Sequence, residues 1–190
     1  MATTATKTEA YSSLIDYCKE TSTLSSANGL LGWDQETLMP SGAIAFRGKQ
    51  MSLIARICHE RFTSDKVGDW LAECESNVDL VSDPLSVEAV NVRWIRHQYD
   101  RARTLPSSLV EEEAQLTSAS QHVWQEARKK DDFETFKPYL QKIITLLQKK
   151  AECFGWDDGG ECWDALAEDY EPGCTAAEVE KVFKPLRENL

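Results

Sequence analysis

One pair of neighbouring residues, His59-Glu60, could begin a metal-binding motif. In the H-E-x-x-H pattern, two histidines four residues apart on a helix direct both imidazoles at one zinc ion. Here the run is HERFT, so Thr63 occupies the position where the second histidine is needed. The other histidines, His97 and His122, have no neighbours at ligand spacing. The sequence therefore predicts no catalytic residue, no metal ligand and no bound cofactor in this chain.

Other catalytic patterns are also absent from the sequence. The serine pairs Ser12-Ser13 and Ser107-Ser108 lack the G-x-S-x-G setting of an activated nucleophile. Gly159-Gly160 is not followed by the Lys-Ser/Thr of a phosphate-binding loop. Neighbouring carboxylates such as Asp157-Asp158 are usually solvated in so acidic a chain, and their context does not suggest a role in acid–base catalysis.

The stretch from Leu30 to Arg47 has more sequence-specific chemistry than any other, because it places an aromatic ring, a carboxylate and a guanidinium close together. Its notable positions are Trp33, Asp34, Met39, Pro40 and Arg47. We favour an architectural interpretation, in which Trp33 fills the core while Asp34 caps a helix or pairs with Arg47. In the alternative, these residues form the wall of a groove or a surface for a partner.

A second candidate segment is Tyr170-Glu171-Pro172-Gly173. Pro-Gly is a turn signal, so the favoured interpretation is a rigid turn that leads into the last helix. The alternative is again a surface that contacts a substrate or a partner.

Charge and composition exclude several classes of partner. The chain has 190 residues and a net charge of −11, and such a surface repels phosphate backbones and anionic lipids. We therefore expect neither nucleic-acid binding nor membrane insertion, and no apolar run reaches the roughly 18 residues of a membrane helix. The start, MATTATKTEA, does not resemble a secretory signal. The six cysteines lack C-x-x-C spacing, which favours free thiols in a reducing, cytoplasmic setting.

Apolar residues at helical spacing predict an all-α fold of long antiparallel helices. We expect residues 1–7 to be a disordered tail and residues 8–190 to form a single helical domain. The first helix starts at Thr8 and continues through Asn28-Gly29, because the apolar spacing resumes in phase at Leu30. A second helix is predicted from about 43 to 62.

Capping signals divide the rest of the chain. Ser64-Asp65 predicts the start of a short helix, and residues 76–82 are expected to be a polar loop. Ser82-Asp83-Pro84 predicts the start of a helix that ends near Thr104. Pro106 and Asp131-Asp132 predict the starts of two longer helices, the second of which stops at Gly155 and contains Pro138. Residues 155–174 are expected to be irregular apart from a short turn at 163–168. Thr175 and Glu178 form a capping box before a last helix.

Three passages resemble the carboxypeptidase Taq family, in the order in which that family has them. They are LLGWDQETLMPSGAIAFRGKQMSLIARICHE, from Leu30 to Glu60; LPSSLVEEEAQLTSASQHVWQEARKKDDFETFKPYL, from Leu105 to Leu140; and WDALAEDYEPGCT, from Trp163 to Thr175. The pattern W-D-Q-x-T-x-M-P followed by an arginine, with Y-E-P-G far downstream, is a specific combination.

The resemblance implies an all-helical metallocarboxypeptidase, a hydrolase that removes carboxy-terminal residues from peptides. Its zinc or cobalt ion would be held by HExxH and a further glutamate, with a metal-activated water and the motif glutamate as general base. The family's members are often dimers, and in related helical metallopeptidases the amino-terminal helices form one wall of a substrate groove. The metal motif lies beyond the region that this sequence matches, so no catalytic residue is carried over.

Two hypotheses follow from this resemblance. In the first, the chain is the amino-terminal helical region of such a carboxypeptidase, a truncated form that is inactive without the catalytic half. In the second, it is a noncatalytic protein-interaction subunit or adaptor derived from that family. The expected partner is thus the catalytic half or another protein subunit, and a homodimer is also compatible with the family.

Overall fold

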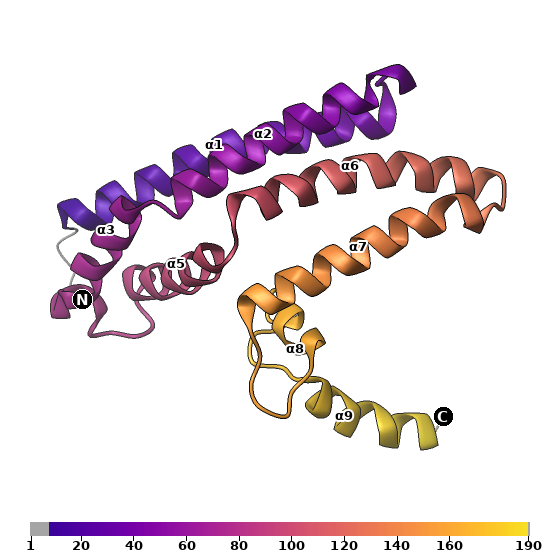
Figure 1. The fold of residues 1–190 in the computed structure, drawn as a ribbon. Helices are drawn as coiled ribbons and strands as arrows, with labels where there is room; N and C mark the ends of the chain where they lie inside the picture. Colours follow the sequence, from indigo (N-terminus) through magenta and orange to yellow (C-terminus); the bar gives the residue numbers. More distant parts are fainter. Residues whose placement is uncertain (1–7, 190) are drawn as a thin grey trace. The chain divides into compact units, whose positions relative to one another are not determined.

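The computed structural model describes residues 8–189, and every regular element in this range is a helix (Figure 1). The all-α prediction is therefore confirmed. The predicted disordered tail, residues 1–7, lies outside the described residues, as does Leu190. The chain divides into two compact units, Met1–His122 and Val123–Leu190, and each unit is described by itself. The expectation of a single domain stays a prediction.

The first unit begins with a long helical hairpin (Figure 1). Helix α1 (Glu9–Thr37) starts after Thr8, whose side-chain oxygen accepts a hydrogen bond from the Tyr11 amide at 3.2 Å. It runs unbroken through Asn28-Gly29, as predicted, and the Asn28 side chain donates across the hairpin to the Met51 carbonyl at 3.1 Å. A 3₁₀ turn, η1 (Ser41–Ala43), leads into helix α2 (Ile44–Phe62). The hairpin places the two ends of the Leu30–Arg47 stretch opposite each other.

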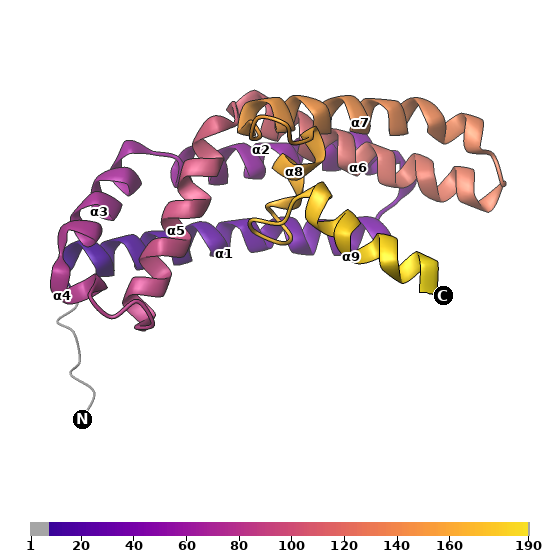
Figure 2. The same cartoon turned by 90° about the horizontal axis from the view of Figure 1, so that it is seen from below.

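The core of the first unit lies where α1 meets three further helices, α3 (Asp65–Ser76), α4 (Val78–Val81) and α5 (Val87–Thr104) (Figure 2). Apolar side chains from all four helices are buried there, because one face of each is apolar. The buried residues of this cluster are Ala10, Tyr11, Leu14, Val67, Leu71, Cys74, Leu80, Val92 and Tyr99.

Two predictions in this region are wrong in detail. Residues 76–82 are not a loop throughout, since α4 forms there with Asn77 as its cap. Helix α5 starts at Val87 rather than at Ser82-Asp83-Pro84. The Asp83 carboxylate accepts from the Leu85 amide at 3.0 Å and so closes a local turn, while the Ser86 hydroxyl accepts from the Ala89 amide at 3.1 Å and caps the helix. A side-chain oxygen can serve either purpose, and sequence does not distinguish them.

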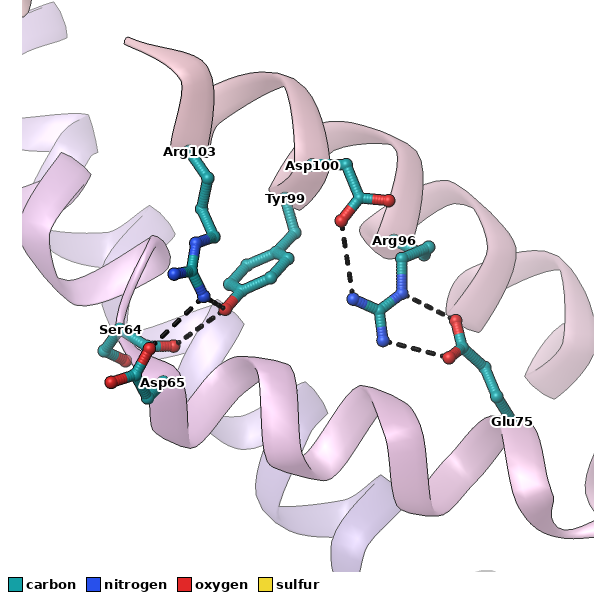
Figure 3. Close-up of polar contacts among 7 residues, drawn as sticks. All are labelled: Ser64, Asp65, Glu75, Arg96, Tyr99, Asp100 and Arg103. Carbon is teal, nitrogen blue, oxygen red and sulfur yellow. Dashed lines mark hydrogen bonds and ion pairs between the residues drawn. The ribbon is translucent and has the colours of Figure 1, made fainter. Parts of the chain in front are cut away.

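A partly exposed ion pair joins helices α3 and α5 (Figure 3). The Arg96 guanidinium donates to both carboxylate oxygens of Glu75, at 2.7 and 2.9 Å, and to Asp100 at 3.4 Å. The hydrogen bonds with Glu75 raise the pKa of Arg96 further above its usual range. A bidentate pair of this kind fixes the register of the two helices.

A second contact between these helices centres on the buried Tyr99 ring (Figure 3). Its hydroxyl accepts a hydrogen bond from Arg103 at 2.7 Å and donates to the Ser64 carbonyl at 3.4 Å, and Arg103 also pairs with Asp65 at 3.2 Å. Ser64 precedes α3 as predicted, but its hydroxyl donates to the Arg61 carbonyl instead of capping the helix. The start of α3 is therefore held by tertiary contacts.

Helix α6 (Ser107–Lys129) begins in the first unit and ends in the second. It is followed by α7 (Phe133–Phe154), α8 (Cys162–Ala167) and α9 (Ala176–Asn189). The predicted starts at Pro106 and Asp132 are confirmed, since the Asp132 carboxylate caps α7 through the Thr135 amide at 3.2 Å. Helix α7 runs through Pro138 and stops at Gly155. Helix α8 occupies the predicted short turn.

Candidate functional site

The corner between α1 and α2 is built by backbone hydrogen bonds around Asp34 and Pro40. The amides of Leu38 and Met39 both donate to the Asp34 carbonyl, at 3.0 and 2.9 Å, which ends α1. Pro40 is extended, with φ −60° and ψ 137°, and its carbonyl accepts from the Ala43 amide at 2.9 Å. The chain therefore reverses within the Met39-Pro40 segment, and Arg47 lies in the first turn of α2 with α1 beside it.

Arg47 is the buried centre of this corner, with 9 % of its surface exposed. Its Nη2 pairs with the Asp34 carboxylate at 2.5 Å, its Nη1 donates to the Leu31 carbonyl, and its Nε donates to the Gln50 side chain at 3.3 Å. A buried guanidinium needs such partners, because an unpaired charge away from water is strongly unfavourable. Of the two roles predicted for Asp34, capping a helix or pairing with Arg47, the structure therefore shows the pairing.

Trp33 does not fill the core, so that part of the architectural interpretation is wrong. Its side chain is 60 % exposed, because Leu31 and Asp34 occupy the side of α1 that faces Arg47. Of the other predicted positions in this stretch, Met39 is half-buried and Pro40 is exposed. The corner therefore combines a buried ion pair with an exposed indole.

The first part of α6 lies against this corner. The Ser118 hydroxyl donates to the Gln35 side-chain oxygen at 2.6 Å, and the Gln35 amide group donates to the Ser118 carbonyl at 3.2 Å. Gly48 faces the same helix, at ordinary contact distance from Gln115 and Ser118. Sequence reasoning did not single out Gln35 or Ser118. The available signal in the sequence was that Gln35 directly follows Trp33-Asp34. The spacing of residues does not indicate a hydrogen-bond partner 83 residues away.

An apolar patch covers the other side of the hairpin. A helix turns by about 100° per residue, so positions 30 and 33 of α1 and positions 46 and 53 of α2 point away from Gln35 and Gly48. All four carry large exposed apolar side chains, and we call them the outer hairpin patch: Leu30, Trp33, Phe46 and Leu53.

The predicted turn at Tyr170–Gly173 is confirmed in the second unit. The amides of Tyr170 and Glu171 donate to the Ala167 carbonyl, at 2.8 and 2.9 Å, and the Gly173 amide donates to the Glu168 carboxylate at 2.7 Å. Tyr170 is 90 % exposed, and Glu171, Pro172 and Gly173 are exposed as well. The turn is held by backbone hydrogen bonds and by the Glu168 carboxylate, so the exposed side chains of Tyr170, Glu171 and Pro172 are available for contacts.

Asp164 joins α8 to the start of α9. One of its carboxylate oxygens accepts from the Ala176 amide at 2.7 Å, and the other accepts from the Glu161 amide at 2.9 Å. These backbone hydrogen bonds hold the pKa of Asp164 below its ordinary value. Sequence reasoning missed this residue, because Asp164 lies 12 positions before the amide that it binds.

A small cavity of about 320 Å³ lies where α6 ends and α7 begins. Its walls are largely apolar, and the residues that line it are Trp124, Ala127, Arg128, Asp131, Asp132, Phe133 and Phe136. Arg128 pairs with Asp131 at 3.4 Å at the rim. The cavity offers an apolar surface without an arrangement of groups for catalysis.

His59 is engaged in structural hydrogen bonds. Its Nδ1 lies 3.1 Å from the Ser107 hydroxyl and its Nε2 lies 3.0 Å from the Ala102 carbonyl. Thr63, at the position where a second metal-binding histidine is needed, donates its hydroxyl to the His59 carbonyl at 2.8 Å. Across residues 8–189, no group of three or more histidine, cysteine, aspartate or glutamate side chains could hold a metal ion. The described residues therefore do not supply a metallopeptidase donor set.

Comparison with known proteins gives the chain a family. Residues 13–190 match the family described as Carboxypeptidase Taq (M32) metallopeptidase. Thermostable carboxypeptidase 1 of Thermus thermophilus is 41 % identical over 188 residues, which cover 95 % of this chain and 37 % of the relative. Thermostable carboxypeptidase 1 of Pyrococcus furiosus is 32 % identical over 170 residues, which cover 86 % of this chain and 32 % of the relative.

The fold also matches solved structures, over a similar share of this chain and of the solved chains. The crystal structure of BsuCP superposes with a TM-score of 0.87 at 25 % identity, over 95 % of this chain and 35 % of the solved chain. The chain thus spans about a third of the length of the relatives it matches. With 178 of its 190 residues inside the family match, the chain belongs to the carboxypeptidase Taq (M32) metallopeptidase family.

Proposed function

We propose that this chain is the amino-terminal helical region of a metallocarboxypeptidase, whose complete form releases carboxy-terminal residues from peptides. The observation that carries the proposal is the match of residues 13–190 to the family, together with coverage of 37 % of the Thermus relative. In this proposal the chain by itself is inactive, because His59 is engaged by Ser107 and Ala102 and no second histidine follows it at motif spacing.

The metal of the complete enzyme, zinc or cobalt, would be held by residues outside the span of this chain. The donor set within residues 8–189 does not fit it. This chain's own contribution is architectural. The Arg47–Asp34 pair fixes the corner between α1 and α2, and that corner presents the Trp33 indole at the surface.

The family-motif positions would then serve as a groove wall or a partner surface. Trp33 is exposed on a rigid helical hairpin, and an exposed aromatic on a rigid support is typical of contact surfaces. Met39 and Pro40 shape the turn next to it. In the second unit, the turn at Tyr170–Gly173 presents an almost fully exposed phenol.

The test is the intact mass of the protein from its natural source, measured with its metal content. We expect a chain between two and three times 21.4 kDa with about one zinc or cobalt ion, and a chelator-sensitive release of carboxy-terminal residues from a peptide. The 190-residue chain produced alone should release none. Chelator-sensitive release by the purified 190-residue chain would contradict the proposal.

The second candidate function is a noncatalytic subunit or adaptor that binds another protein. It is favoured by the outer hairpin patch, because four large apolar side chains are exposed together there. A native mass near 21.4 kDa without metal would support this function over the first. A homodimer through the same patch would appear as a doubled mass in solution.

The partner in either case would be protein. The net charge of −11 disfavours nucleic acid and anionic lipid. Among residues 8–189, no helix has the length and apolar character needed to cross a membrane. All six cysteines are free thiols, which fits a reducing compartment such as the cytoplasm.

A further inference from the structure

The chain reverses where α6 ends and α7 begins, and backbone hydrogen bonds build this corner (Figure 1). The Asp132 amide donates to the Ala127 carbonyl at 2.9 Å, and the Asp131 amide donates to the Arg128 carbonyl at 3.4 Å. This is the Schellman arrangement, which needs a left-handed residue just after the helix. Asp131 supplies it with a φ of 51°. The reversal therefore fixes the backbone positions from which Arg128 and Asp131 extend.

The start of α7 is fixed by Asp132. Both the hydroxyl and the amide of Thr135 donate to the Asp132 carboxylate, the amide at 3.2 Å. These hydrogen bonds hold the pKa of Asp132 below its ordinary value, and they engage both of its carboxylate oxygens. Of the two carboxylates beside the cavity at this corner, Asp131 is the one that the helix cap does not use.

Three aromatic rings stand in the walls of the cavity: Trp124 from α6, and Phe133 and Phe136 from α7. Every lining residue lies between positions 124 and 136, so the walls belong to the second unit by itself. The cavity volume is about 320 Å³, whereas an apolar cavity of about 150 Å³ is enough to hold benzene. The cavity therefore has room for one large apolar side chain and a small polar group attached to it.

Two opposite charges stand side by side at the rim of the cavity. The Arg128 guanidinium lies 3.4 Å from the Asp131 carboxylate. Single ion pairs at a protein surface are weak, so this one can open for a ligand at little cost. A free α-amino acid has a carboxylate and an ammonium group on the same carbon atom, and it therefore offers a charge-assisted partner to each rim group at once.

A peptide end fits this rim less well than a free amino acid. A carboxy-terminal residue has the carboxylate for Arg128 but lacks the ammonium for Asp131. An amino-terminal residue has the ammonium but lacks the carboxylate. Either would separate the two rim charges and leave one of them without a partner, which is unfavourable next to an apolar cavity.

We propose that this cavity binds a free α-amino acid with a large apolar side chain, such as phenylalanine. The side chain lies among the rings of Trp124, Phe133 and Phe136, while Arg128 binds the carboxylate and Asp131 binds the ammonium group. This inference goes beyond the proposed function and does not depend on it, because this chain supplies the walls and both charges. Free amino acids are also what a carboxypeptidase releases, so such a site would bind a product of the proposed reaction.

The experiment titrates the ¹⁵N-labelled 190-residue chain with L-phenylalanine and follows its amide signals by NMR. Amides between positions 124 and 136 should shift and saturate, with a dissociation constant of about 1 mM or lower, as expected for so small a ligand. Glycine, which has both charges but no side chain, should bind at least tenfold more weakly. N-acetyl-L-phenylalanine and L-phenylalaninamide, which each lack one charge, should bind at least fivefold more weakly.

Arg128→Gln and Asp131→Asn should each weaken the binding of L-phenylalanine at least fivefold. Asparagine tolerates the left-handed conformation at position 131, so the corner is preserved. Lys130→Gln and Glu134→Gln are the matched controls, because they make the same changes in charge at residues that do not line the cavity; the affinity should equal that of the unaltered chain.

Ala127→Leu tests the cavity itself. Ala127 lines it, and a leucine side chain would occupy part of its volume, so the affinity for L-phenylalanine should fall at least tenfold. Far-ultraviolet circular dichroism of each variant checks that the helices are folded.

Three results would overturn the inference. The first is the lack of saturating shifts in the unaltered chain at L-phenylalanine concentrations up to about 10 mM. The second is equal binding of L-phenylalanine and of its two singly charged analogues, which would mean that the rim charges do not select an amino acid. The third is equal affinity of the Asp131→Asn and Glu134→Gln chains. None of these results would alter the proposed function, which is tested by mass, metal content and peptidase activity.

Discussion

The hydroxyl oxygen of Tyr99 lies 2.5 Å from the point where a Cβ at position 68 would stand, and the ring Cζ lies 3.2 Å from it. Gly68 is on α3 and Tyr99 is on α5, so the absence of a side chain at one position lets the phenol of the other fit between the helices. The phenol cannot easily retreat, because it is buried and hydrogen-bonded to Arg103 and Ser64.

Gly68→Ala should therefore lower the free energy of unfolding by about 1–3 kcal/mol, the usual effect of overpacking. Urea denaturation followed by circular dichroism measures it. Gly48→Ala is the control, because a Cβ there would be at an ordinary 3.7 Å from Gln115. That change should leave stability unchanged or raise it by up to about 1 kcal/mol through helix propensity. Equal effects of the two changes would contradict the prediction.

Tyr99→Phe should partly rescue Gly68→Ala. In the unaltered chain the change should be destabilising by about 1 kcal/mol, because the hydroxyl's bonds with Arg103 and Ser64 are lost. In the Gly68→Ala chain it also removes the clashing oxygen, so the two effects should be non-additive by at least about 0.5 kcal/mol. A double-mutant cycle in urea gives this coupling, and strict additivity would show that the close approach has no energetic consequence.

Arg47→Met should destabilise the first unit by about 2–3 kcal/mol, because it leaves Asp34 and the Leu31 carbonyl without their charged donor. Arg47→Lys should recover only part of this loss, since a single ammonium cannot reproduce the donors of the guanidinium. Lys49→Met, two residues away and exposed, should change stability by less than about 0.5 kcal/mol. Thermal unfolding of the three variants measures these losses of stability. If Arg47→Met and Lys49→Met changed the stability equally, the Asp34–Arg47 ion pair would be shown not to stabilise the first unit.

The junction of α8 and α9 should weaken in acid. Hydrogen bonds from the Ala176 and Glu161 amides lower the pKa of Asp164 below its ordinary value of 3.8. A lowered folded-state pKa means that the stabilisation is present above pH 3.8 and is lost as the pH falls through the lower, folded-state value. The amide proton of Ala176, followed by NMR, should shift over that acidic range. Asp164→Asn should abolish this titration, whereas Asp158→Asn should preserve it.

Gly155 should not tolerate a side chain. It ends α7 with φ 74° and ψ 166°, a conformation that is essentially restricted to glycine. Gly155→Ala should lower the stability of the second unit by about 1–3 kcal/mol, although open space surrounds the position. Gly42→Ala has similar space without the positive φ and should be nearly neutral in the same thermal melt. If Gly155→Ala left the stability unchanged, α7 would be shown to end equally well in another backbone conformation.

The boundaries of most helices followed from local chemistry alone. Pro106, Asp132, Gly155 and the Thr175–Glu178 box each act within one helical turn, so their effects can be read from neighbouring residues. The start of α5 was misplaced because Asp83 and Ser86 can both bind nearby amides, and only the structure shows which one caps the helix.

The helical class and the turn at Tyr170–Gly173 could be predicted from the sequence, because periodicity and turn signals are local. The sequence left two roles open for Asp34, capping a helix or pairing with Arg47, and the structure shows the pairing. The folded chain alone shows the exposure of Trp33, the Gln35–Ser118 bonds and the clearance between Gly68 and Tyr99. Each of these depends on which helix lies alongside which, over separations of dozens of residues. Packing of that kind is set by the summed burial of many apolar side chains, and no single spacing in the sequence encodes it.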